Sequence, residues 1–168
     1  MSVLKLKIYK IEDKLIINIQ EVEAVLQLYD LTIQKPQLFQ LSQFGYGFFI
    51  NLFWYIFTLG NFQILCLTDK TKLVHFTYII PKVYRFPFMK GGDIQIGPCL
   101  TSEDYRKKGV YKSVLQYIIE KYSAKGRSLW IYTAEKNIAS QSVIEKVGFQ
   151  FCSMATISKL TKVVKLIN

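Results

Sequence analysis

A short basic segment that ends in a glycine carries the most evident chemistry in this sequence. Residues 105–111 read Tyr-Arg-Lys-Lys-Gly-Val-Tyr and lie between a strand pattern and a helix pattern. A helix start presents unpaired backbone N–H groups and the positive end of the helix dipole, so it binds phosphate oxygens. Gly109 lets the backbone approach a pyrophosphate without an intervening side chain. The segment predicts a phosphate-binding turn, although Arg-Lys-Lys before a helix is also found in solvated loops.

A second patterned segment, residues 137–149, reads Asn-Ile-Ala-Ser-Gln-Ser-Val-Ile-Glu-Lys-Val-Gly-Phe. An Asn before a run of helical residues is typical of a helix start, and a Gly after the run is typical of its end. The sequence therefore predicts a second short helix in this segment.

Strand patterns surround both segments and would have to position them. Alternation of apolar residues and turn signals predict strands at residues 62–67, 73–80, 93–101, 128–133 and 149–157, with a hairpin turn at 69–72. The hydrophobic period becomes helical at residues 110–122 and again at 139–147. The order β-β-β-α-β-α-β predicts an α/β (α+β) fold in which an antiparallel hairpin leads into a crossover unit.

The N-terminal third has weaker patterns. Residues 3–9 alternate as in a half-buried strand, residues 21–29 could form a helix, and residues 39–59 are expected to be helical in part. No repeat or linker divides the chain, so we expect a single domain over residues 1–168.

The charge balance bounds the partners. The 168 residues include 22 Lys and Arg against 12 Asp and Glu, which gives a net charge of +10. Such a field attracts nucleic acid, an anionic membrane or a phosphate-rich cofactor, and charge alone does not choose among them. The lysines are dispersed and no nucleic-acid recognition motif is present, so no nucleic acid is expected as a partner.

Cysteine and histidine usage makes a zinc site improbable. The three cysteines are far apart, no CxxC pair occurs, and His75 is the single histidine. Reduced thiols and the lack of a signal-peptide pattern at the amino terminus indicate a cytoplasmic protein. The apolar run 48–59 is shorter than the roughly 20 residues of a spanning helix. It predicts a buried element or, alternatively, a patch for peripheral membrane or partner contact.

The two patterned segments together resemble the signatures of the GNAT N-acetyltransferase superfamily. The first signature is Arg or Gln, two residues, Gly, one residue, then Gly or Ala, which opens a helix. Arg106 and Gly109 match it, and Tyr111 stands where the second small residue is usual. Residues 137–149 resemble the second signature, and the resemblance covers residues 60–157. It implies a mixed, mostly antiparallel sheet that is flanked by helices and splayed at an acyl-CoA site.

The resemblance also implies acetyl-CoA as co-substrate and a set of residues that bind it. In such folds the strand before the first signature pairs through its backbone with the pantetheine arm, and Pro98, which lacks an N–H, suits a site where sheet pairing stops. The matching residues are Cys99, Leu100 and Thr101 for pantetheine; Arg106, Lys107, Lys108, Gly109, Val110 and Tyr111 for the pyrophosphate; and Asn137 and Ser140 for the thioester end.

The implied reaction is attack of an acceptor amine on the acetyl thioester. Two customary helpers are missing, because Ile144 stands at the position of the acidic Tyr and Gln95 at that of the basic Glu. His75 is a substitute base, since an ordinary histidine titrates near neutrality. We expect it opposite Val74 and able to reach the cleft near Gln95. The candidate catalytic residues are His75, Gln95 and Ser140, with Asp93 and Tyr132 as weaker alternatives.

Several alternatives stay open. Within the family, the segments 75–77, 96–99 and 109–111 are similar to enzymes of bacterial surface-polysaccharide pathways, which implies an amino-sugar or nucleotide-sugar acceptor. Protein amines and small polyamines are the other acceptors that the sequence leaves open. The rival functions are an acyl-CoA-binding relative without catalysis, a basic nucleic-acid-binding module and a membrane-associated module; a homodimer is also open.

Overall fold

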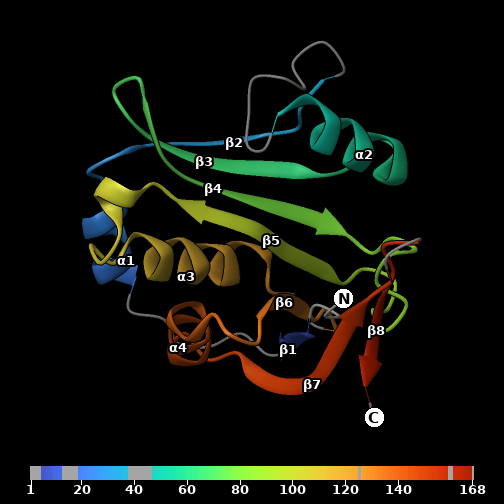
Figure 1. Cartoon of the computed structure of the whole chain (residues 1–168). Helices are drawn as coiled ribbons and strands as arrows, with labels where there is room; N and C mark the ends of the chain where they lie inside the picture. Colours follow the sequence, from blue (N-terminus) through green and yellow to red (C-terminus); the bar gives the residue numbers. More distant parts are fainter. Residues whose placement is uncertain (1–4, 13–18, 38–46, 125, 159–160, 168) are drawn as a thin grey trace.

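The computed structural model describes residues 5–12, 19–37, 47–124, 126–158 and 161–167 (Figure 1). The expectations for residues 3–4 and 39–46 lie outside the described residues. No helix in the described part of the chain is long and apolar enough to cross a membrane.

An eight-stranded sheet in the order β2-β3-β4-β5-β6-β1-β7-β8 forms the centre of the fold. The elements are β1 (Lys5–Ile11), α1 (Ile19–Leu26), β2 (Asp30–Gln34), α2 (Phe48–Thr58), β3 (Gln63–Asp69), β4 (Lys72–Pro81), β5 (Ile94–Thr101), the 3-10 helix η2 (Glu103–Tyr105), α3 (Val110–Tyr122), β6 (Leu129–Ala134), α4 (Ile138–Lys146), β7 (Gln150–Ile157) and β8 (Val164–Ile167). β5 and β6 pair in parallel, and the other described pairs are antiparallel. The predicted mixed, mostly antiparallel fold with flanking helices is confirmed.

The helices lie on two faces of this sheet (Figure 1). α1, α3 and α4 bury apolar side chains in one core, to which the sheet contributes residues such as Leu65 and Ile96. α2, the loop 82–92 and β8 close a second core around Phe76 and Tyr78. Because residues of a strand alternate between faces, one sheet supplies both cores.

The N-terminal strand completes the middle of the sheet. β1 lies between β6 and β7, where Leu6 pairs with Ala134 on one side and with Ala155 on the other. Leu6, Ile8 and Tyr9 are almost fully buried. The sequence predicts a strand here, but alternation within one strand carries no information about its neighbours.

Two edge strands were not predicted. β2 has 5 residues and β8 has 4, and neither alternates between buried and exposed residues over its whole length. Both depend on pairing with a single neighbour: β2 pairs with β3, which follows α2 along the chain, and β8 pairs with the preceding strand, β7.

A buried carboxylate joins the paired ends of β5 and β6. Asp93 is 1% exposed. Its oxygens accept hydrogen bonds from the backbone N–H of Lys90 at 2.8 Å, the backbone N–H of Ser128 at 3.0 Å and the indole Nε1–H of Trp130 at 2.8 Å. These contacts give Asp93 a structural role and argue against it as a catalytic alternative.

Replacing Asp93 with Ala should therefore lower the free energy of unfolding by about 3 kcal/mol, because three buried donors lose their acceptor. Urea denaturation followed by circular dichroism measures the change. The exposed Asp104 is the matched control, and its replacement with Ala should change stability by less than about 0.5 kcal/mol. Equal effects of the two substitutions would contradict this account.

Candidate functional site

The sheet opens between its two parallel strands. Ile94, Gln95 and Ile96 of β5 pair with residues 129–131 of β6, and no pair follows in the described ladder. On the other side of β5 the ladder with β4 passes from Thr77 opposite Cys99 to Ile79 opposite Ile96. Gly97 and Pro98 thus oppose the single residue between Thr77 and Ile79, which is the count of a β-bulge and re-aims the strand. Gly97 has φ 101°, a left-handed value that favours glycine.

The unpaired end of β5 presents backbone groups to this opening. Ser102 donates its N–H to the carbonyl of Val74 on β4 at 2.9 Å. Since successive residues of a strand address opposite neighbours, Leu100 also faces β4, and the backbone groups of Cys99 and Thr101 face the opening. The predicted pantetheine edge is therefore a strand edge without a partner strand.

Both helix starts meet the carboxyl ends of these strands. α3 follows β5 and α4 follows β6, so their first turns lie at the same end of a parallel pair (Figure 1). In open α/β sheets this end, where neighbouring strands part, is the usual place for ligands.

The turn before α3 has the properties expected of an anion site. Arg106, Lys107, Lys108 and Gly109 are all exposed. Gly109 has φ 80° and no side chain caps the helix. The first helical hydrogen bond runs from Ser113 N–H to the Gly109 carbonyl at 3.0 Å, so the amides between these residues have no intrahelical acceptor. The turn is also held in place, because Arg106 Nε donates to the Thr101 carbonyl at 3.2 Å.

The departure of Tyr111 from the family signature leaves this turn open. Its ring stacks on the imidazole of His75, with centroids 6.0 Å apart, and its hydroxyl interacts with the thiol of Cys99. Burial raises the pKa of Tyr111 well above its ordinary value. The side chain therefore points toward the sheet, and the outer surface of the turn stays clear.

His75 lies elsewhere than predicted. It pairs with Thr101, whereas Gln95 pairs with Ile80, so the expected position of His75 near Gln95 is wrong. The register between β3 and β4 also shifts beside Thr68. Val74 therefore packs in the core on the α3 side of the sheet, and not on the face opposite His75 where we expected it.

Both ring nitrogens of His75 are engaged. Nδ1 lies 2.7 Å from the hydroxyl of Thr101 and Nε2 lies 2.6 Å from that of Thr77. The residue is 0% exposed, and burial lowers its pKa to about 3. A ring with so little affinity for a proton is a poor general base, so these contacts favour a positioning role between β4, the end of β5 and Tyr111.

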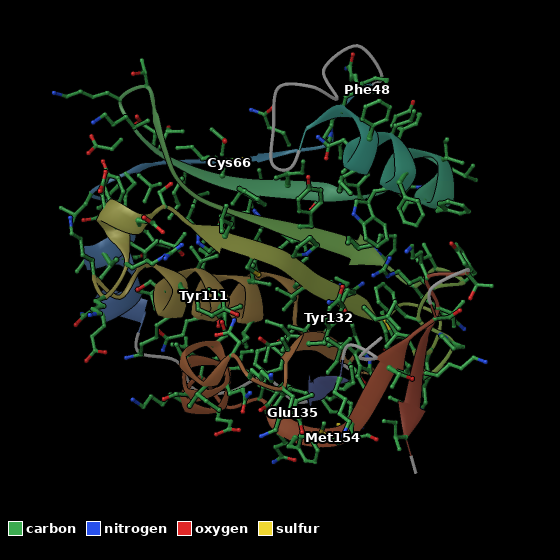
Figure 2. All side chains as sticks on the ribbon, viewed as in Figure 1. Phe48, Cys66, Tyr111, Tyr132, Glu135 and Met154 are labelled. Atoms are coloured by element: carbon green, nitrogen blue, oxygen red, sulfur yellow. The ribbon has the colours of Figure 1, made fainter. Side chains whose placement is uncertain are left out.

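The remaining candidates have mixed surroundings. Gln95 is 1% exposed, and its Nε2 donates to the Ile96 carbonyl at 2.6 Å. Asn137 uses its Oδ1 to accept from the Ser140 N–H at 3.1 Å, which caps α4. Burial raises the pKa of the Cys99 thiol to about 12, so it stays protonated at neutral pH although the residue as a whole is partly exposed. Tyr132 lies on β6, one residue beyond the last pair with β5 (Figure 2).

One residue of the site was missed in the sequence. Gln141 Nε2 donates to the carbonyls of Ala134 at 3.2 Å and Glu135 at 2.7 Å, and its Oε1 accepts from the ammonium of Lys7 at 2.9 Å. It fixes the start of α4 to the end of β6 and to β1. A polar residue on the same helical face as Ile144 was the available signal.

A separate pocket of about 400 Å³ lies beside the later turns of α3. Its lining is mostly apolar and comes from α1, from Leu31 of β2 and from α3. Its lining includes no residue of the turn at 106–109, of β5 or of β6, so it is distinct from the opening between these two strands. Among the residues that the structure describes, no three His, Cys, Asp or Glu side chains are grouped as a metal site.

A mixed sheet that opens beside a basic, uncapped helix start defines an α+β fold of the GNAT type. Residues 37–149 match the model of the Acetyltransferase (GNAT) family. That match spans more than half of the chain, and the protein belongs to this family. No curated protein matches the sequence.

Solved structures share the fold at low sequence identity. An acetyltransferase from the GNAT family of Colwellia psychrerythraea has a TM-score of 0.61 at 16% identity, over 89% of this chain and 53% of that one. A GCN5-related N-acetyltransferase from Sphaerobacter thermophilus gives 0.57 at 12%, over 93% and 51%. A functionally unknown conserved protein from Staphylococcus epidermidis gives 0.56 at 14%, over 91% and 60%. The chain thus spans between half and two thirds of these proteins' lengths.

The buried imidazole makes stability depend on pH. Because the pKa of His75 is about 3 in the folded chain and 6.5 ordinarily, the unfolded chain binds more protons between these values. The free energy of unfolding should therefore fall as the pH drops below about 6.5, with a contribution of up to about 1.4 kcal/mol per pH unit.

Urea denaturation of the wild type and of His75→Gln at pH 7, 6 and 5 isolates this contribution, since the carboxylates are common to both. The difference in the free energy of unfolding between the two proteins should become smaller as the pH falls. In the wild type, the imidazole proton resonances should keep the neutral shift down to pH 4, and a midpoint near 6.5 would contradict the assignment.

Proposed function

We propose that the protein transfers an acetyl group from acetyl-CoA to the amine of a small molecule. The observation that carries the proposal is the unpaired edge of β5 that leads into the uncapped, cationic start of α3. Family membership supports acetyltransferase chemistry, and the donors present at the opening fit the substrate that such chemistry needs.

The pyrophosphate would lie on the turn at residues 106–109. The first turn of α3 contains no acidic residue, and its free amides and the helix dipole favour a dianion. Lys107, Lys108 and Arg106 add charge, although the Arg106 Nη1 already lies 3.2 Å from Glu103. Charge-assisted hydrogen bonds from a fixed turn would set the register of the whole substrate.

The pantetheine arm would extend along β5 from this turn. Backbone N–H and carbonyl groups of Cys99 and Thr101 face the opening, and an amide of the arm can pair with them as an added strand does. The bulge at Gly97 and Pro98 would then end the pairing, so the thioester would lie near residues 97–98.

The chemistry would rest on a few polar groups. Ile144 is 0% exposed and has no proton to give, so the phenol of Tyr132 is the hydroxyl that we assign to protonate the leaving thiolate. His75 is too weak a base, and the amine would lose its proton to water. Positioning of amine and thioester would supply most of the acceleration.

The acceptor that we propose is a sugar that carries an amine. The similarity of residues 75–77, 96–99 and 109–111 to enzymes of surface-polysaccharide pathways favours an amino sugar or nucleotide sugar. The net charge of +10 disfavours a polycationic acceptor. A binding protein without catalysis is the second candidate, because Gln95 and Ile144, at the two customary catalytic positions, are both buried.

Substitution of Lys108 by Ala should weaken coenzyme A binding about tenfold, because one cationic contact to the diphosphate is lost. Isothermal titration calorimetry at low salt measures the affinity. Lys121, in the last turn of the same helix, provides the matched control and should leave affinity unchanged. Unchanged binding in Lys108→Ala and Gly109→Ala together would refute the site.

A screen of amine acceptors with acetyl-CoA, read by thiol release, tests turnover. Tyr132→Phe should lower kcat at least tenfold while coenzyme A affinity stays the same, since the phenol acts only in the chemical step. Tyr84→Phe, an exposed tyrosine outside the opening, is the control. Coenzyme A binding with no turnover on any amine would support the non-catalytic candidate instead.

A further inference from the structure

The polarity of α2 is inverted relative to an ordinary surface helix. The side chains that it turns toward the sheet are Asn51, Trp54 and Thr58, of which two are polar. Its outward side chains are aromatic and aliphatic. A helix on a water-facing surface normally has the opposite arrangement.

The inward polar groups are already used inside the fold. Asn51 Oδ1 accepts a hydrogen bond of 2.6 Å from the hydroxyl of Tyr78, and Thr58 Oγ1 donates to the Trp54 carbonyl at 2.7 Å. Trp54 stacks on Phe86 with centroids 6.3 Å apart. These contacts fix the rotation of α2, so its apolar residues are held outward.

The outward surface is large and strongly exposed. Phe49 is 83% exposed, Ile56 56% and Leu59 86%. Further exposed apolar residues of the same surface are Phe48, Ile50, Phe57 and Tyr84. At about 100° per residue, the exposed positions cover a sector of roughly 200° around the helix, which is wider than the stripe that one packed neighbour covers. We call these seven residues the α2 patch.

The charges around the α2 patch have one sign. The sequence has no charged residue from 36 to 68. The segments 81–92 and 161–167, which lie next to α2, contain Lys or Arg residues but neither Asp nor Glu. The ring of Phe57 lies 4.8 Å from that of Tyr84, whose hydroxyl donates to the Thr161 carbonyl at 3.3 Å. Lys82 and Lys162, both exposed, belong to these two segments.

Arg85 adds a further positive charge beside α2. Its guanidinium lies 5.7 Å from the centroid of the Trp54 ring. Its Nε–H is buried and has no hydrogen-bond partner among the described residues. Since Arg85 as a residue is partly exposed, its charge adds to those of Lys82 and Lys162 and suits the anionic headgroups of lipids.

From these observations we infer that α2 is an interfacial helix that docks the protein on an anionic lipid bilayer, with the α2 patch among the acyl chains and Lys82, Arg85 and Lys162 at the headgroups. With 11 residues it lies on the surface rather than spans. A fluid bilayer can surround a sector of 200°, whereas a rigid protein partner covers less. Tyr84, which is 46% exposed, suits the boundary between headgroups and acyl chains.

Docking in this way leaves the opening between β5 and β6 accessible. α2 belongs to the core on one face of the sheet, and α3 with its basic turn belongs to the other (Figures 1 and 2, with Phe48 and Tyr111 labelled). A soluble acyl-CoA can therefore reach the turn while the opposite face contacts lipid.

Flotation with vesicles tests the inference. One set of vesicles contains phosphatidylcholine alone, and the other contains phosphatidylcholine with about 30% phosphatidylglycerol, which makes the surface anionic. Both are used at about 150 mM salt. We expect the protein to float with the anionic vesicles and to remain largely free with the neutral ones. Phe49→Asp combined with Ile56→Asp should reduce the bound fraction at least tenfold.

Leu28→Asp is the matched control, since Leu28 is 71% exposed but lies after α1. It should float as the wild type does. Lys82→Glu with Lys162→Glu should weaken binding to the anionic vesicles and leave the α2 patch intact. Thermal unfolding and coenzyme A affinity of each variant establish that the fold is retained.

Two results would overturn the inference. One is flotation of the Phe49→Asp, Ile56→Asp protein at the wild-type level. The other is a wild-type protein that sediments as a dimer, does not bind vesicles, and becomes monomeric with the same two substitutions. The α2 patch would then join two copies of this chain.

Discussion

The loss of pairing between β5 and β6 after Ile96 is the constraint from which the other features of the site follow. Two parallel strands that separate leave backbone donors and acceptors without partners, which is costly unless water or a ligand satisfies them. The fold holds the strands together on one side of this point through Asp93 and lets them part on the other through the bulge at Gly97 and Pro98. Helix α3, which follows β5, then places the free amides of its first turn at the opening, and the capped start of α4 lies at the same end.

A network behind the opening keeps its parts in register. His75 contacts the hydroxyl of Thr101 at the end of β5 and the ring of Tyr111 at the start of α3, so one buried side chain joins the two halves of the candidate acyl-CoA site. The large Tyr111, which departs from the family pattern, fills the space on His75 rather than the turn. On the far side, Gln141 joins α4 to β6 and β1 in a similar way.

Most of the motif-bearing half was predictable because its signals are local. Helix α3 covers the residues for which the 3.6-residue period predicts a helix, 110–122, and the β3–β4 hairpin follows from its turn residues. What escaped prediction depends on how each strand pairs with its neighbours. The position of β1, the short edge strands and the surroundings of His75 are set by register, and a one-residue shift in β4 changes which side chains share a core. The inverted polarity of α2 was also missed, because the run that forms it has only two polar residues, Asn51 and Thr58, and was expected to be buried as a whole or in part.

The location of β1 bears on how the chain reaches its native state. β1 is the first described element along the chain, yet both of its neighbours, β6 and β7, come from the last third of the sequence. Such sequence separation slows closure, since chain entropy is lost before the contacts form. During translation β1 must therefore wait, with Leu6 and Ile8 uncovered, until β6 and β7 have been made. Nascent chains are consequently expected to expose this apolar strand to chaperones until then.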